Sequence, residues 1–442
     1  MLLAPMGAAV LRGQQIDTGT TVGMKAVKIA VPEFKPSTAD AKISQLAKVF
    51  NDTLWNDLDF SGNLTLASRS FYPVGNFANP VDIRADDWTK TGVEASYITY
   101  GSVAIPTTGS MRGAFTADLH FTELKSNQSP LQPVRWSGGL DTDDAARFVA
   151  HSWANAILES LGFGKGVATT KIAYVADRAG AKEIYIMDYD GYGAFPLTAV
   201  RDLALTPAWS PDGEQIAFMG YRGSVTNIEV ISRRGGNPVS FPSPAGLNTT
   251  PAWSPDGKRI AFASNRDRHT TDGTEIYVAN SNGGNMTRLL PRTTTRGIDT
   301  SPVWNPATGR EIAFVSDRSG SQQIYRINDD GTNLRRIIDD GGDAENPSWS
   351  PDGNFLAFAW KKAGRGFDIY LHDLATGRNS QLTQNAGDNE KPTWSPDGKH
   401  IAFQSDRTGS LQIFSMLADG SKPRQLTRSG VNKAPAWSGY IK

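Results

Sequence analysis

The second half of the chain repeats one pattern of apolar and polar positions. Each repeat has a Pro-x-Trp phrase and a Pro-Asp-Gly turn, then an apolar strand of the Ile-Ala-Phe type and two further short β-rich runs. The tryptophans stand 43 to 51 residues apart, at Trp209, Trp253, Trp304, Trp349, Trp394 and Trp437. Four short strands per repeat at this period predict the blades of a β-propeller.

The two ends of the repeat region complement each other. The apolar second-strand pattern also occurs at Ile172–Tyr174, ahead of the first tryptophan phrase, whereas Pro435–Ser438 supplies a first strand with nothing after it. Pairing the two would complete a sixth blade and remove the free sheet edges that otherwise promote aggregation. We therefore expect a six-bladed β-propeller over residues 170–442, closed by a C-terminal strand.

Residues 25–165 have a different pattern, which predicts an α/β N-terminal domain and so a two-domain protein. The stretch Ser37–Asp40 can cap a helix whose apolar residues recur at helical spacing, and a second helix is expected from Asp141 to Leu161 with Gly162 as its stop. Alternating runs predict strands at 25–31, 63–68, 97–105 and 114–124.

The first 24 residues fit neither domain. Residues 1–13 are mostly small and apolar, as in the remnant of a signal peptide, although a frayed N-terminus or a misplaced start codon would look the same. Residues 14–24 are rich in glycine and threonine and have too few apolar residues to fold alone, so we expect a flexible segment.

Composition narrows the possible functions. Lysine plus arginine balance aspartate plus glutamate at 45 each, so no net charge would attract nucleic acid, and there is no cysteine. No run of 18 apolar residues predicts a transmembrane helix. A closed, neutral propeller needs no second copy, and we expect a monomer.

Candidate chemistry is sparse. The chain has no Gly-x-Ser-x-Gly nucleophile motif, no phosphate- or dinucleotide-binding glycine motif, and five scattered histidines. Asp188–Gly191 resembles part of a calcium loop but lacks the closing glutamate, and His151 is better interpreted as a packed histidine than as a ligand. We therefore expect no catalytic residue, metal or cofactor.

The residues just ahead of each Pro-x-Trp phrase differ from blade to blade, and in a propeller they should surround one mouth of the central channel. Side chains that vary on a rigid scaffold often recognise a partner. The alternative explanation is that these loop residues differ by chance drift. The tryptophans, and the Ser-Asp-Arg turns such as Asp317–Arg318, are instead expected to be structural.

The repeat phrase, the leading α/β domain and the closing Pro435–Ser438 together resemble the TolB family of periplasmic propeller proteins of the Tol–Pal system. The resemblance covers nearly the whole chain. It implies a non-enzymatic periplasmic interaction hub that supports outer-membrane integrity and envelope constriction during cell division. The implied partners are the lipoprotein Pal, the inner-membrane-anchored TolA and further proteins of the outer membrane.

The resemblance also implies sites. The Pal-binding residues at the propeller mouth would be Leu247, Asn248, Thr249, Thr250, Thr300, Ser301, Glu345, Asn346, Asn389, Glu390, Asn432 and Lys433. The family often has histidine where Leu247 stands. The TolA-binding residues would be Ile16, Asp17, Thr18 and Gly19, in an extended segment that could add a strand to a partner's sheet.

Two alternatives remain open from the sequence. A propeller-type enzyme would need acid and base groups around the channel, for which Glu345, Glu390, Lys391 and Lys433 are the obvious supply. A carbohydrate-sensing propeller unrelated to Tol would use the same mouth but would fail to capture Pal.

Overall fold

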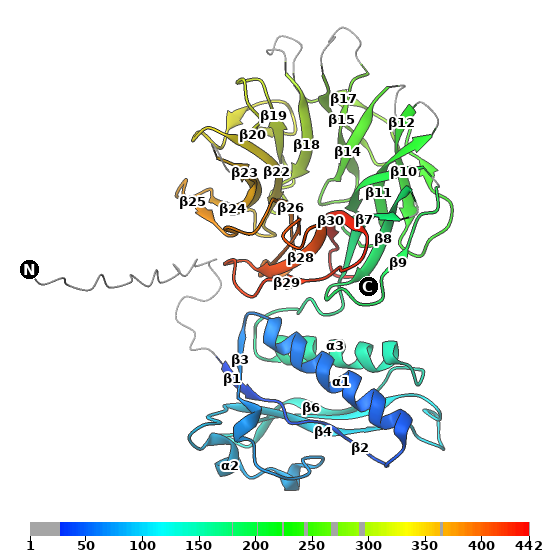
Figure 1. Ribbon diagram of the computed structural model, residues 1–442, viewed down its shortest axis with the longest axis vertical. Coiled ribbons are helices and arrows are strands. Elements are labelled where there is room, and N and C mark those ends of the chain that lie inside the picture. Colours follow the sequence, from blue (N-terminus) through cyan, green and yellow to red (C-terminus); the bar gives the residue numbers. More distant parts are fainter. Residues whose placement is uncertain are drawn as a thin grey trace, which may run out of the picture.

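The computed structural model describes eight stretches of the chain, namely residues 27–178, 180–200, 202–222, 225–242, 246–266, 273–290, 297–362 and 366–441. The predicted signal-peptide remnant, the segment 14–24 and the four TolA-binding candidates lie outside these residues. Figure 1 shows two bodies, a helical and sheet layer at one end and a ring of sheets at the other.

The N-terminal part is a mixed sheet with two long helices on one face. Its strands run in the order β3-β1-β4-β5-β6, and the short β2 also pairs with β4. The bounds are β1 Val27–Ala30, β2 Lys35–Pro36, β3 Leu64–Leu66, β4 Tyr97–Ala104, β5 Thr116–Glu123 and β6 Gln128–Ser137. Four of these strands fall where alternation predicts them, which confirms the α/β class of this domain.

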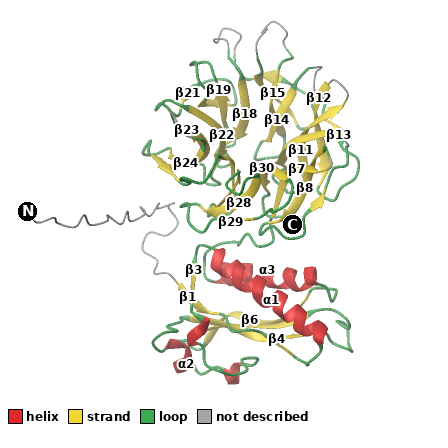
Figure 2. Cartoon of the chain, in the orientation of Figure 1, coloured by secondary structure: helices red, strands yellow, loops and turns green. Residues whose placement is uncertain are grey.

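The two long helices begin at or close to their predicted starts. Helix α1 (Ala41–Phe60) has Asp40 as its N-cap, whose carboxylate accepts from the backbone N–H groups of residues 42 and 43. Helix α3 (Asp143–Ser160) begins two residues after the predicted start at Asp141, with Thr142 as its N-cap and two aspartates in its first turn. Both helices lie between the sheet and the propeller (Figure 2).

Besides the short strand β2, four elements of this domain were not expected. Strand β6 is mostly exposed and contains two prolines, so it shows no buried alternation, and its place at the sheet edge explains why the prolines are tolerated. The other three are the short helices η1 Arg69–Phe71, η2 Pro80–Asp82 and α2 Ala85–Thr89. Trp88 of α2 is fully buried against the sheet face opposite the long helices.

The propeller contains four separate four-stranded antiparallel sheets. In chain order they are β14 Asn248–Trp253, β15 Arg259–Ser264, β16 Glu275–Asn280 and β17 Thr287–Arg288; β18 Asp299–Trp304, β19 Glu311–Ser316, β20 Gln323–Asn328 and β21 Arg335–Arg336; β22 Asp343–Trp349, β23 Phe355–Lys361, β24 Asp368–Asp373 and β25 Asn379–Gln381; β26 Asn389–Trp394, β27 His400–Ser405, β28 Gln412–Leu417 and β29 Arg424–Gln425.

An eight-stranded sheet completes the ring and contains the predicted closure. Strand β30 pairs with β7, with Trp437 opposite Ile172, as the orphan tryptophan phrase predicts. Two antiparallel groups, β30-β7-β8-β9 and β10-β11-β12-β13, are joined by one parallel bridge between Leu203 and Lys182. The bounds are β30 Val431–Trp437, β7 Lys171–Arg178, β8 Ala181–Asp188, β9 Phe195–Pro196, β10 Leu203–Trp209, β11 Gln215–Arg222, β12 Val225–Ser232 and β13 Val239–Ser240.

The repeated residues build the propeller core. The Ile-Ala-Phe positions of the second strands are fully buried, and Trp304, Trp349 and Trp394 lie buried between neighbouring sheets. Each of these three indoles donates its N–H to a backbone carbonyl of the preceding sheet's first strand, at 3.1 to 3.2 Å. Trp209 and Trp253 are partly exposed, and among the described residues the buried indole nitrogen of Trp253 has no hydrogen-bond partner.

The α/β domain is attached to the propeller through the end of α1. The Phe60 ring packs 4.8 Å from the His400 ring and lies 4.1 Å from the Arg424 guanidinium, centre to centre. His400 Nε2 donates to the Phe60 carbonyl at 2.7 Å, and Asp59 accepts from Lys422 and Arg424. Phe60 is 2% exposed. It therefore acts as an apolar plug surrounded by directional polar contacts.

Removing the tryptophan ring should affect stability unequally among the blades. We expect Trp304→Ala to lower the unfolding free energy by about 3–5 kcal/mol, because a buried ring and its hydrogen bond are both lost. Trp253→Ala should cost less, since that ring is already partly exposed and its N–H bonds no partner. Denaturant unfolding followed by circular dichroism measures both losses, and a Trp253→Ala loss as large as that of Trp304→Ala would contradict this account.

Candidate functional site

Six residues with left-handed backbone conformation surround one end of the central channel. They are Thr206, Thr250, Ser301, Asn346, Lys391 and Ala434, each with φ between 48° and 52° and each directly ahead of a proline. Non-glycine residues rarely adopt this conformation, and threonine tolerates it less well than asparagine. Such strain persists only where the surrounding structure enforces it, which indicates a feature of the scaffold.

The enforcing element is a bulge in the first strand of every blade. In β14 the pairing with β15 shifts between Thr249 and Ala252, so Thr250 and Pro251 have no opposite residue, and the other five first strands shift at the same place. Proline has no N–H to donate at this point, and the bulge removes the need for one. The six bulges thus form a uniform collar with variable side chains.

The collar encloses a cavity of about 130 Å³. Its walls are the six left-handed residues, the six prolines that follow them and Val303. A cavity of this size is smaller than the several hundred Å³ usual for small-molecule sites, and it is open at the mouth. It can accept a side chain or a short loop of a partner.

The structure divides the Pal-binding candidates into two groups. Leu247 is exposed, and eight others are partly exposed along the mouth: Thr249, Thr250, Thr300, Ser301, Glu345, Asn346, Glu390 and Lys433. In contrast, Asn248, Asn389 and Asn432 are fully buried. These three asparagines stand three residues ahead of the proline, where the side chain points into the blade. They are therefore removed from the set that could contact a partner.

The buried asparagines instead stabilise the blade interior. Asn432 donates to the Gln412 side chain at 2.8 Å, and Asn389 accepts from Arg407 at 2.7 Å. Asp299 takes the same position in its blade and pairs with Arg318 at 2.8 Å. Arg318 and Arg407 of the Ser-Asp-Arg turns thus pair locally, as expected of structural residues.

The candidate list also lacks three residues of the collar. Thr206, Lys391 and Ala434 line the cavity but are absent from the Pal-binding residues that the resemblance implies. All three stand one residue ahead of the repeat proline, in the same place as Thr250 and Ser301. Their position directly ahead of a Pro-x-Trp phrase already predicts from the sequence that they lie at the mouth.

Charge is confined to one side of the mouth. At the two positions ahead of each proline, three consecutive blades carry only uncharged residues, whereas the other three bring together Glu345, Glu390, Lys391 and Lys433. Burial and the neighbouring Glu390 carboxylate raise the pKa of Glu345. Burial lowers the pKa of Lys391, although both glutamates oppose that shift. The mouth therefore has a neutral half and a half with mixed charge.

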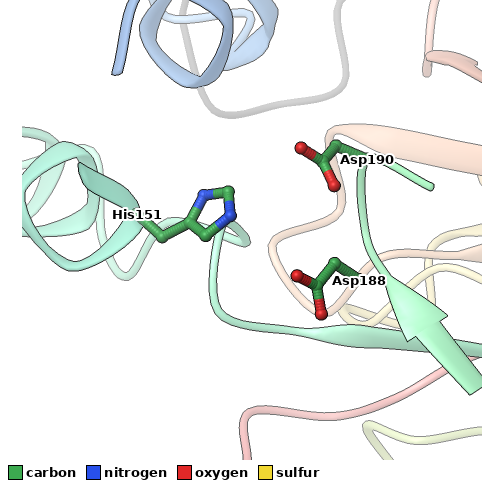
Figure 3. A group of neighbouring side chains, drawn as sticks. All are labelled: His151, Asp188 and Asp190. Atoms are coloured by element: carbon green, nitrogen blue, oxygen red, sulfur yellow. The ribbon is translucent and has the colours of Figure 1, made fainter. Parts of the chain in front are cut away.

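A second cluster of polar residues lies where the two domains meet. His151 of α3 points toward Asp188 and Asp190 at the end of β8 (Figure 3), and these three offer ligand atoms within 4.8 Å of one another. His151 is 4% exposed, which confirms that it is a packed histidine. Its Nδ1 donates to Asp57 at 2.7 Å, and Asp57 also accepts from the Tyr189 hydroxyl at 2.6 Å. Burial raises the pKa of Tyr189, so this hydroxyl remains a donor.

The cluster is poorly suited to a metal ion. Arg147 pairs with Asp190 and contacts His151 Nε2 at 3.2 Å, while Lys171 pairs with Asp188. Both carboxylates already have a cation, and a metal would have to displace the arginine from a buried network. The arrangement is better explained as an ion network that joins α1 and α3 to the propeller.

Comparison with known proteins agrees with this architecture. The family model for the TolB β-propeller domain matches residues 158–346 and 339–440, more than half of the chain. A TolB crystal structure from Acinetobacter baumannii superposes with a TM-score of 0.76 and 25% sequence identity, covering 94% of this chain and 98% of that one.

Two curated relatives extend the comparison. The Tol-Pal system protein TolB of Bordetella pertussis is 32% identical over 249 residues, which are 56% of this chain and 52% of that protein. The TolB homologue of Chlorobium chlorochromatii is 30% identical over 304 residues, 67% of this chain and 62% of that protein. The matched region thus spans about half the length of the first of these relatives.

The fold and the collar define a β-propeller protein with an N-terminal α/β domain. Among the described residues, no helix has the length and apolar character needed to span a membrane. On the family match over more than half of its length, the chain belongs to the TolB β-propeller family.

The raised pKa of Glu345 predicts a pH-dependent stability. A group whose pKa is raised on folding contributes stability that is present below its unfolded pKa, near 4.5, and is lost as the pH rises through the folded value. Glu345→Gln removes this loss. We therefore expect the variant to gain stability relative to the wild type between about pH 4 and about pH 7. Denaturant unfolding at both pH values measures the difference in unfolding free energy between variant and wild type, with the exposed Glu33→Gln as control. The same difference at pH 4 and at pH 7 for Glu345→Gln would contradict this prediction.

Proposed function

We propose that this protein is a non-catalytic periplasmic interaction hub of the Tol–Pal system. In this proposal Pal binds at the collar, TolA binds through residues 14–24, and the complex supports outer-membrane integrity and envelope constriction during division. Membership of the TolB family supports the assignment to the Tol–Pal system. One structural observation supports the collar as the Pal-binding site, because the collar presents a different pair of side chains from each blade.

The chemistry of the collar favours binding over catalysis. Perturbed pKa values such as those of Glu345 and Lys391 are common at active sites, but they also arise in structural ion networks. Here the cavity of about 130 Å³ leaves little room for a substrate, and Glu390 is held by the Gln404 side chain at 2.6 Å. These charges are better suited to orient a partner, because interfacial charges mainly set specificity.

The architecture of the hub follows from the sheet pairing. We take the two halves of the eight-stranded sheet as two blades, since among the described residues a single bridge joins them and each half has the strand order of a blade. With the four separate sheets this makes six blades. The domains would then be residues 25–165 and 170–442, as expected from the sequence.

A charged, bulky residue at the neutral half of the collar should block Pal. We expect Thr300→Arg to weaken Pal binding about tenfold or more, or about 1.4 kcal/mol, because the guanidinium would be forced into the interface. Calorimetric titration with purified Pal measures this loss. Thr287→Arg on the outer strand β17 is the matched control, because Thr287 is exposed and distant from the collar. Wild-type affinity in Thr300→Arg would reject the site.

The TolA part of the proposal is tested separately. Deleting residues 14–22 should abolish TolA binding and leave Pal binding within about twofold, because the collar is untouched. Replacing the same residues by a Gly-Ser segment of equal length controls for chain length. Unchanged TolA affinity in either variant would contradict this assignment.

A further inference from the structure

The face that carries the α/β domain has a crevice between two blades that Phe60 fills. Its walls are His400 and Arg424 on one blade and, on the next sheet, Trp437, which belongs to the same apolar cluster as Phe60. The remaining cavity beside Phe60 is only about 10 Å³. The propeller can therefore bind an aromatic side chain tightly in a crevice of this kind.

The equivalent crevice ahead of β14 is open. Gln215 begins β11 as His400 begins β27, and Val239 pairs opposite Val230 as Arg424 pairs opposite Ser415. Trp253 ends the next first strand, as Trp437 does. Together with Phe241 and Pro242, these residues line a cavity of about 990 Å³. Val239 is 70% exposed and Gln215 is exposed, so this crevice is accessible.

Trp253 shows that the crevice is incompletely packed. Its ring is partly exposed, and its indole nitrogen lacks the bond to the preceding sheet that Trp304, Trp349 and Trp394 make. The nearby Phe241 is 4% exposed and provides an apolar floor. An aromatic ring inserted here would cover apolar surface that now faces solvent, which is favourable at about 25 cal/mol per Å².

The charges around the two crevices differ. Lys422 and Arg424 hold the Asp59 carboxylate beside Phe60, whereas Asn237 and Val239 take their places in the open crevice. Among the described residues, the lining of the open crevice contains Asp212 and Asp256 but no lysine or arginine. An occupant with an acidic neighbour would be repelled, and one with a basic neighbour would be attracted.

The open crevice is also continuous with the domain interface. Tyr440 lines it, and the Tyr440 hydroxyl donates to the Lys165 carbonyl in the segment that joins the two domains, at 2.8 Å. A partner bound in the open crevice would therefore lie next to the part of this propeller face that α1 covers.

We propose that the crevice formed by Gln215, Val239, Phe241 and Trp253 binds an aromatic side chain of a partner protein. The aromatic residue is flanked by a basic rather than an acidic residue. Its backbone carbonyl accepts from the Gln215 amide, as the Phe60 carbonyl accepts from His400. This site lies on the face opposite the collar and is independent of Pal and TolA.

The chain supplies its own probe. A peptide with the sequence of residues 56–63 contains Phe60 as its single aromatic residue, and the same peptide with Asp59→Lys carries the flanking charge that the open crevice favours. We would titrate both into the full chain labelled with 5-fluorotryptophan and follow the ¹⁹F signal of Trp253, assigned with Trp253→Phe. The Asp59→Lys peptide should give a saturable shift and bind at least about fivefold more tightly than the unchanged peptide.

A charge swap makes the test specific. The double variant Asn237→Lys, Val239→Arg restores the cations found beside Phe60, and both residues are exposed, so folding should be retained. This variant should prefer the unchanged peptide, reversing the order of affinities. The Asp59→Lys peptide that also carries Phe60→Ala should not bind. No shift of Trp253 with either Phe60 peptide, an equal shift with the Phe60→Ala peptide, or no reversal in the double variant would overturn the proposal.

Discussion

The pairing of β30 with β7 is the interaction on which the rest of the structure depends. It joins the last strand of the propeller to the first, with Trp437 opposite Ile172, and it leaves no exposed edge between the two ends of the ring. The closed ring fixes where each blade stands, and therefore where each collar residue and each crevice lies. It also places Thr170, at the exit from the α/β domain, against the Trp437 indole at 2.8 Å. Closure and domain attachment thus share one point.

The first strand performs two tasks at its two ends. At the collar end, the bulge ahead of the proline holds residues such as Thr250 and Lys391 in a strained conformation whose cost the sheet must offset. At the other end, the tryptophan packs on the preceding sheet and donates to its backbone. A strand anchored at its tryptophan end can present variable residues at the bulge without losing its place. This explains how the repeat stays constant while the collar changes from blade to blade.

The sequence predicts well what depends on period and poorly what depends on contacts across the fold. The tryptophan spacing and the orphan phrase at Trp437 predict the ring closure, because a repeat must bury the same apolar positions each time. The Asp40 cap of α1 is a local signal and lies in the stretch where a cap was expected, whereas α3 begins two residues after its predicted start. Strand β6 was missed because an exposed edge strand has no buried alternation. The burial of Asn248, Asn389 and Asn432 was missed because the bulge, which sets the side-chain direction, is not visible in the spacing.

The contrast between Phe60 and Trp253 gives the two faces of the propeller different physical characters. On the collar face, recognition depends on polar and charged residues around a small cavity, where complementarity of hydrogen bonds and charge decides the partner. On the opposite face, Phe60 packs in one crevice between blades, and in our proposal the open crevice at Trp253 accepts an aromatic ring with a basic flanking residue. Two partners bound on opposite faces would not compete for the same residues. The closed ring between them is rigid, so one scaffold can hold both at a fixed separation.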